Sequence, residues 1–168
     1  MFKIIGFFML VTAGMLSGCS ISKSISERVN FLEQYLEFIS TMETEIRYTY
    51  CQPSDIIKKY SGSGQFHLFL KNCSDYYCLG TPFPKAWKKS LEEYKQNLNL
   101  SPETYRLIKN FGEGLGSSDI DGQIAHCEYH KQTIKPYLQD ELENKRNKSK
   151  MYGILGTCLG IIVGITII

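Results

Sequence analysis

The sequence predicts an all-α protein, a helical bundle whose long first and last helices continue into N- and C-terminal transmembrane helices. Apolar residues recur at steps of three and four through most of the chain, and no stretch keeps the strict alternation that is typical of a strand. Two uncharged apolar segments, residues 4–21 and 151–168, close the two ends. Each has about 18 residues, which is close to the length that a helix needs to cross a bilayer.

These segments divide the chain. We predict a transmembrane helix at residues 1–21, a cytoplasmic helical domain at 22–150 and a second transmembrane helix at 151–168. The middle part has about 129 residues, which is enough for one domain with its own core. The net charge of +2 gives no general attraction to nucleic acid, so the lipid membrane is the expected charged partner. The cysteines have no framework-like spacing, so reduced thiols are expected.

Positive charges beside the two segments predict their orientation. Lys23 and Arg28 follow the first segment, and a basic cluster at 145–150 precedes the second. Because Lys and Arg beside membrane spans are retained in the cytoplasm, we expect a hairpin with both termini outside. The alternative is an exported lipoprotein with a helical binding domain, since residues 16–19 fit a lipoprotein cleavage box in which Cys19 is lipidated. That alternative translocates the whole basic cluster, and we favour the uncleaved span.

The first half of the middle part is predicted from its periodicity. Residues 22–50 form one long helix with a heptad-like seam, a short helix runs from 53 to 60, and another covers 65–72. Residues 73–84 are rich in turn formers and are expected to be mostly irregular. The two cysteines in this segment are expected to be free thiols in an irregular loop. The seam of the long helix consists of Ile25, Val29, Leu32, Leu36, Ile39, Ile46 and Tyr50, with Met42 or Glu43 in the gap.

The second half is predicted from helix end signals. Residues 85–97 carry an amphipathic pattern. Residues 101–103, Ser-Pro-Glu, are a strong helix start with Ser as the cap, and the three glycines between 112 and 116 are expected to end that helix. Ser118 is predicted to cap the last helix, which bends at Pro136 and passes into the terminal span.

Two histidines suggest a metal site that the sequence does not complete. His126 and His130 lie four residues apart and therefore share a helix face. A zinc metalloprotease needs Glu directly after the first histidine, where this chain has Cys127, and no third ligand is recognisable. We interpret the pair as an ordinary solvated helix face and keep a membrane-tethered metalloenzyme as a third hypothesis. No nucleophile, base and oxyanion site assemble in the sequence, so we expect no enzymatic activity, metal or cofactor.

Glycines at four-residue spacing mark a face on each terminal segment. Gly156, Gly160 and Gly164 leave a groove along one side of a membrane helix, and Gly14 and Gly18 repeat the spacing in the first segment. We predict that these faces pack against another helix. The sequence leaves open whether that helix is the other span, a second copy in a homo-oligomer or a different protein.

Four stretches carry a family resemblance. They are Met42-Glu-Thr-Glu-Ile-Arg-Tyr48, the helix start at Pro53, Phe111-Gly-Glu-Gly-Leu-Gly116 and the terminal apolar segment after a basic flank. Together they resemble the stage III sporulation protein AB family over essentially the whole chain. The first and third stretches are the most specific.

The resemblance implies a non-enzymatic scaffold in a secretion-like complex between the mother cell and the forespore of an endospore-forming bacterium. It implies a location in the mother-cell membrane that faces the engulfed forespore, with the soluble domain in the cytoplasm. Its fold is expected to be similar to the platform proteins of type II secretion and type IV pilus machines, an analogy of fold alone. The implied partners are other stage III sporulation proteins, namely a cytoplasmic secretion-type ATPase and membrane and ring-forming components. The predicted partner contacts lie in the two specific stretches: Glu43, Glu45, Phe111, Gly112, Glu113 and Gly116.

Overall fold

The computed structural model describes residues 2–49, 55–57, 60, 64–98 and 100–167, without the side chains of 2–22, 96–97, 149–150 and 152–167. In this part of the chain every regular element is a helix, which confirms the predicted all-α class. The longer helices are α1 (Phe2–Thr49), α3 (Gln65–Cys78), α4 (Phe83–Leu98), α5 (Pro102–Gly114) and α6 (Ile120–Ile167).

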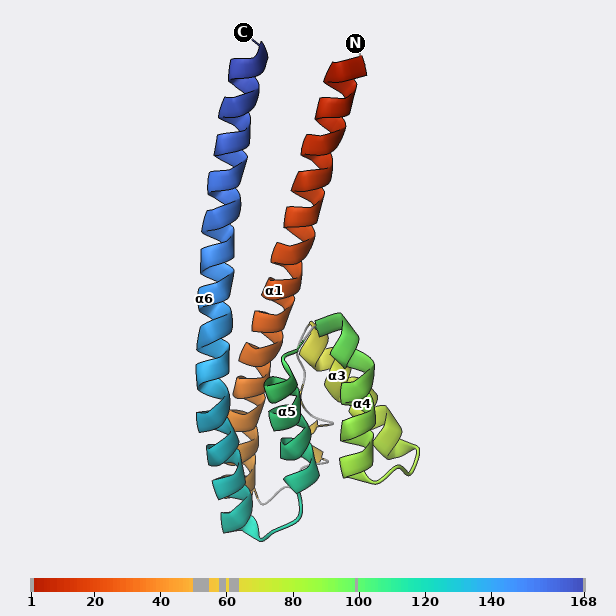
Figure 1. The fold of residues 1–168 in the computed structure, drawn as a ribbon. Helices are drawn as coiled ribbons and strands as arrows, with labels where there is room; N and C mark the ends of the chain where they lie inside the picture. The colour runs from red at the N-terminus through yellow and green to blue at the C-terminus, as the bar shows by residue number, and fades with distance from the viewer. Residues whose placement is uncertain (1, 50–54, 58–59, 61–63, 99, 168) are drawn as a thin grey trace.

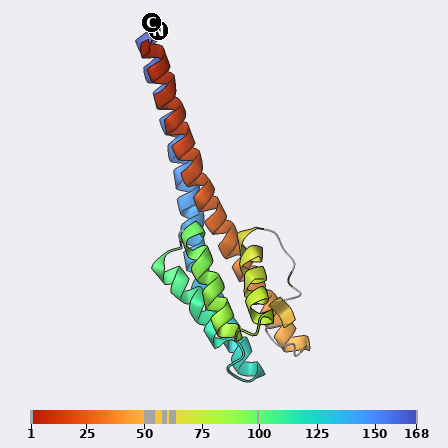
Figure 2. The same cartoon turned by 90° about the vertical axis from the view of Figure 1, so that its right-hand side faces the viewer.

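Two long antiparallel helices form the frame of the molecule. α1 and α6 lie side by side and make the most extensive helix contact. The N- and C-terminal ends of the chain lie at the same end of this pair in both views (Figure 1, Figure 2). The shorter helices gather beside the half that is remote from the termini, where α3 packs on α4, α4 on α5 and α5 on α6. The described part of the fold is therefore a helical bundle with a two-helix extension.

The predicted membrane spans fall on the ends of this extension. In the part of the chain with described side chains, no helix is long and apolar enough to cross a membrane. The backbones of 2–21 and 151–167 are helical, but the side chains of these segments, Met151 excepted, lie outside the described residues. The packing glycines at 14, 18, 156, 160 and 164 and the alternative lipid site at Cys19 fall in the same segments. The spans and the domain limits at 22 and 150 therefore stay predictions.

The buried face of α1 is wider than the predicted seam. Of the seven seam positions, Ile25, Val29, Leu32, Ile39 and Ile46 are buried, Leu36 is half-buried and Tyr50 lies outside the described residues. Phe31, Tyr35 and Phe38 are also fully buried, which the heptad pattern did not predict. Phe31 packs edge-on against Phe66 of α3, with ring centroids 5.2 Å apart. A second stripe is buried because α1 contacts the shorter helices as well as α6.

The prediction for residues 73–84 was wrong in its first half. α3 continues to Cys78, and Cys73 is fully buried rather than a loose thiol. Phe66, Phe69, Leu70 and Cys73 form an i, i+3, i+4, i+7 set, so the helical pattern is complete once cysteine is counted as a small apolar residue. The turn after Cys78 is short, because α4 begins at Phe83. In the predicted helix at 53–60, residues 55–57 are helical and the remainder, except for Tyr60, lies outside the described residues.

The predicted N-terminal cap is confirmed for α5 and corrected for α6. Ser101 caps α5, because its Oγ accepts a hydrogen bond of 3.1 Å from the backbone N–H of Thr104. α6 is capped by Asp119 instead of Ser118, since Asp119 Oδ1 accepts the backbone N–H of Gly122 at 3.0 Å. α6 then continues without interruption through Pro136.

Replacing the cap of α5 is expected to weaken the fold measurably. Ser101→Ala removes the acceptor for the Thr104 N–H, and we expect the free energy of unfolding to fall by about 1 kcal/mol. Asn110→Ala, at an exposed position of the same helix, is the matched control and changes it by less than about 0.5 kcal/mol. Urea unfolding of the purified protein measures both values. An equal effect of the two substitutions contradicts the capping role.

Candidate functional site

The first family-like stretch, residues 42–48, lies where the end of α1 meets the start of α6. Glu43 is only 14% exposed at its side chain and lies between two cations. Lys131 Nζ of α6 donates to Glu43 Oε2 at 2.5 Å, and an Arg47 guanidinium nitrogen donates to Oε1 at 3.0 Å. The hydrogen bond from Lys131 holds the pKa of the Glu43 carboxyl below its ordinary value. Arg47 also lies 3.9 Å from Glu128, so this stretch joins α1 to α6 by charge.

Glu45 and Tyr48 occupy other faces of the same helix. Glu45 is two residues from Glu43 and so points in a different direction, as predicted. Its carboxylate accepts a hydrogen bond of 2.9 Å from Thr49 Oγ1 on the next turn. Tyr48 is 74% exposed. Tyr48 was not predicted as a contact residue, although its position outside the apolar seam of the helix is a signal visible in the sequence.

The second family-like stretch begins with two buried residues of α5. Phe111 is fully buried, and its ring contacts Trp87, Tyr35 and His126 at centroid distances of 5.8, 5.6 and 5.4 Å. Gly112 is also buried, and a Cβ added there would lie 2.1 Å from Cδ1 of Trp87. Two non-bonded carbon atoms cannot come this close, so any side chain at position 112 would displace the indole. Gly112 is therefore required for the contact between α5 and Trp87 of α4. Both residues have a packing role in the folded domain and offer no surface to a partner.

The remainder of this stretch forms the last two residues of α5 and the beginning of the turn to α6. A Cβ at Gly114 would lie 2.4 Å from Cε1 of His126, so this glycine too permits a close approach. Gly116 has a left-handed backbone with φ of 78°, and its N–H donates to Oε1 of Gln123 at 3.0 Å. Gln123 thus fixes the turn to α6, a role that sequence reasoning missed. Glu113 and Gly116 are exposed, and whether they touch a partner stays a prediction.

The histidine pair is part of the core, so its interpretation as a solvated helix face was wrong. His130 is 4% exposed, and the two imidazole centroids are 4.6 Å apart beside the ring of Phe111. His126 Nε2 lies 3.0 Å from the carbonyl oxygen of Phe111 and donates to it. Burial, assisted by the neighbouring His126, lowers the pKa of His130 to about 4. Among the side chains that the structure describes, no three metal-ligating groups gather.

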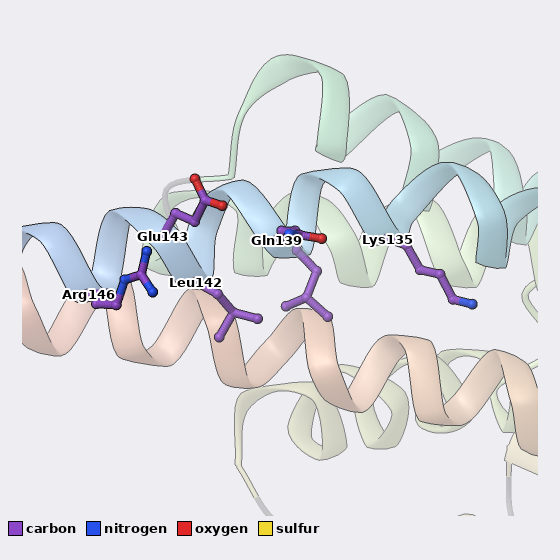
Figure 3. A pocket seen from close by; sticks show the side chains of 6 residues that line it. Lys135, Gln139, Leu142, Glu143 and Arg146 are labelled. Carbon is purple, nitrogen blue, oxygen red and sulfur yellow. The ribbon is translucent and has the colours of Figure 1, made fainter.

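A groove lies on α6 beside α1, near the middle of α6. It has a volume of about 390 Å³ and is lined by Lys135, Leu138, Gln139, Leu142, Glu143 and Arg146. In Figure 3 the labelled side chains project from α6 along this face, and α1 runs below them. Leu142 is 40% exposed, while Leu138 is buried. This groove was not predicted, although Leu142 stands in a strongly charged run of the sequence.

Comparison with known proteins assigns the family. The sequence pattern described as stage III sporulation protein AB matches residues 3–168. The chain belongs to the stage III sporulation protein AB family. Stage III sporulation protein AB of Bacillus subtilis (strain 168) is 27% identical over 167 residues, covering 97% of both chains. A solved structure of stage III sporulation protein AB has a TM-score of 0.59 and 24% identity, covering 72% of this chain and 98% of that one, and it shows a common fold.

The contact between Gly112 and Trp87 predicts a strong effect of a small substitution. Gly112→Ala forces the indole or α5 to move, and we expect the free energy of unfolding to fall by roughly 3 kcal/mol. Gly116→Ala is the comparison, because it meets no neighbouring atom and has only its left-handed backbone to strain, at about 1 kcal/mol. Thermal and urea unfolding distinguish the two. Equal losses would show that Gly112 is not sterically required.

The buried His130 predicts a loss of stability in acid. The unfolded chain takes up a proton at a pKa near 6.5 and the folded chain only at about 4, so the folded state loses stability as the pH falls from 6.5 towards 4. The loss reaches at most about 3 kcal/mol for this group. His130→Leu removes it, and the difference in free energy of unfolding between wild type and variant should then depend on pH in this window. A difference that is constant from pH 7 to pH 4 contradicts the assignment.

Proposed function

We propose that this family member is a non-enzymatic membrane scaffold in a sporulation complex between mother cell and forespore. The observation that supports it most is the arrangement of the two long helices. The apolar segments 4–21 and 151–168 fall on the ends of α1 and α6, which lie together at one end of the molecule (Figure 1). Two spans at the same end are the geometry of a hairpin anchor, with the bundle held on one side of the membrane.

Charges next to the apolar segments support a cytoplasmic bundle. The side chain of Lys23 is 79% exposed directly after the first segment. Lys145 and Arg146 are exposed shortly before the second segment, and Lys148 is half-buried. These cations flank the inner ends of both segments, where they are retained on the cytoplasmic side and attract anionic lipid headgroups.

The environment of the cysteines supports a role other than catalysis. Burial raises the pKa of the Cys73 and Cys127 thiols to about 12, so both are protonated near neutral pH and are poor nucleophiles. The two neighbouring histidines are engaged in packing with Phe111. The scaffold function then depends on exposed surface. Within the family-like stretches that surface includes Tyr48 and Glu113, the proposed contacts for the ATPase and the ring-forming components.

Fractionation of sporulating cells tests the anchor. The full chain should stay in the membrane pellet after alkaline carbonate extraction, whereas a chain that ends at residue 150 should become easier to extract because one span is lost. Intact mass distinguishes the lipoprotein alternative, since cleavage after Gly18 with acylation of Cys19 changes the mass in a defined way. Release of the full chain by carbonate, or a cleaved and acylated mass, contradicts the hairpin.

Variants of exposed residues test the scaffold role. We expect Tyr48→Ala and Glu113→Arg to reduce both spore yield and co-purification of other stage III proteins without lowering the unfolding temperature. Glu103→Arg, an exposed change near the start of α5, is the matched control and should leave spore yield intact. If all three variants sporulate and co-purify like the wild type, these surfaces are not the contacts.

A further inference from the structure

Two imidazoles hold the first turns of α6 to the end of α5. His126 stacks on the ring of Phe111 with centroids 5.4 Å apart, and its Nε2 donates at 3.0 Å to the carbonyl oxygen of the same residue. His130, one turn further along α6, meets this ring edge-on at 5.3 Å. Gly114 makes room for the first imidazole, because a Cβ there would lie 2.4 Å from its Cε1. This attachment, which we call the histidine latch, consists of His126, His130 and Phe111.

His130 cannot become charged where it lies without a penalty. It is 4% exposed, and its Nδ1 is buried without a hydrogen-bond partner in the described structure. Protonation makes both ring nitrogens donors, so the cation would have one N–H without an acceptor. The charge would also lie beside His126, at a centroid distance of 4.6 Å. Burial, with the neighbouring His126 as the second cause, accordingly lowers the pKa of His130 to about 4.

In the described structure, no carboxylate is bonded to His130. On α6, burial raises the pKa of the Cys127 thiol to about 12, and Tyr129 contributes its ring at a centroid distance of 5.2 Å. On α1, burial raises the pKa of the Tyr35 hydroxyl well above its ordinary value. The charged residues on the adjoining turns of α1, α5 and α6 are closed into ion pairs: Glu43–Lys131, Arg47–Glu128 and Lys109–Glu113.

We propose that the histidine latch is acid-sensitive: when His130 takes up a proton, residues 115–130 separate from Phe111 while the remainder of the bundle stays folded. The charged imidazole then reaches water, which supplies the acceptor that Nδ1 lacks in the core. The segment that opens consists of the turn after α5 and the first turns of α6, at the end of the bundle remote from the termini (Figure 1). The latch lies within the bundle and does not depend on the proposed membrane anchor.

Contacts on either side of this segment set its limits. α5 stays in place because Trp87 packs on Gly112. α6 is held from Lys131 onward by its bond to Glu43 of α1. That bond lowers the pKa of the Glu43 carboxyl, so the pair stays ionised in the weak acid in which His130 takes up a proton. The opening is therefore local.

The pH window follows from the two states of His130. The opened imidazole has its ordinary pKa of 6.5, and the closed one has a pKa of about 4. Because the closed state keeps the imidazole neutral, its stability is complete above pH 6.5 and is lost as the pH falls towards 4. The equilibrium constant for opening should rise roughly twentyfold between about pH 7 and about pH 5.

Labelling of two buried thiols tests the latch in the full chain, purified in detergent. Cys127 lies inside the segment that opens, and Cys73 of α3 is equally buried outside it. Serine replaces the other cysteines. Each thiol is labelled with dithiodipyridine, and each rate is divided by that of the urea-unfolded chain at the same pH. We expect the corrected Cys127 rate to rise roughly twentyfold from about pH 7 to about pH 5, and to exceed the Cys73 rate at least about tenfold in acid.

Two results of this labelling overturn the proposal. Equal corrected rates of the two thiols in acid would mean that the whole domain unfolds. An unchanged Cys127 rate would mean that the segment stays closed.

Histidine variants assign the response to one side chain. His130→Gln removes the titrating group, so its corrected Cys127 rate should change less than about twofold over the same pH range. His67→Gln, at a half-buried position of α3, is the matched control and should keep the full rise. A response that persists in His130→Gln contradicts the latch. Circular dichroism at neutral pH checks that both variants fold, and if His130→Gln does not, the comparison of the two thiols in the wild-type histidine background still decides.

Discussion

The packing of Trp87 on Gly112 is the constraint that holds the shorter helices to the long pair. The Trp87 ring contacts Phe38 of α1, Phe69 of α3 and Phe111 of α5, at centroid distances of 6.3, 4.7 and 5.8 Å. Its Nε1 donates at 2.8 Å to the carbonyl oxygen of Ile108, so the indole nitrogen is satisfied in the core. One side chain thus connects four helices, and it reaches this position only because residue 112 has no Cβ.

Phe111 extends the same constraint to the last helix. Its ring stacks on His126 at an interplanar angle of 9° and meets His130 edge-on, so both histidines are held between α5 and α6. The arrangement also buries polar atoms at a cost, because His130 Nδ1 and the Tyr35 hydroxyl have no hydrogen-bond partner in the described structure. Burial raises the pKa of Tyr35 well above its ordinary value and lowers that of His130. Aromatic packing around Phe111 offsets this cost and keeps the core neutral.

Local signals in the sequence were sufficient for the helices but not for the contacts between them. The start of α5 was predictable because Ser101 and Pro102 determine it within one turn. The role of Gly112 was not predictable, because a glycine near the end of a helix indicates helix termination whether or not an indole packs against it. The burial of His130 was missed for a similar reason, since histidine is compatible with either surface or core. Whether such residues are buried or exposed depends on contact residues that are distant in the sequence.

The residues that resemble the family therefore divide into two groups with different meanings. Glu43, Phe111 and Gly112 are engaged inside the domain, so their presence indicates the fold. Tyr48 and Glu113 belong to the same stretches but are exposed, so their side chains are accessible to another protein. The groove around Leu142 lies outside both stretches.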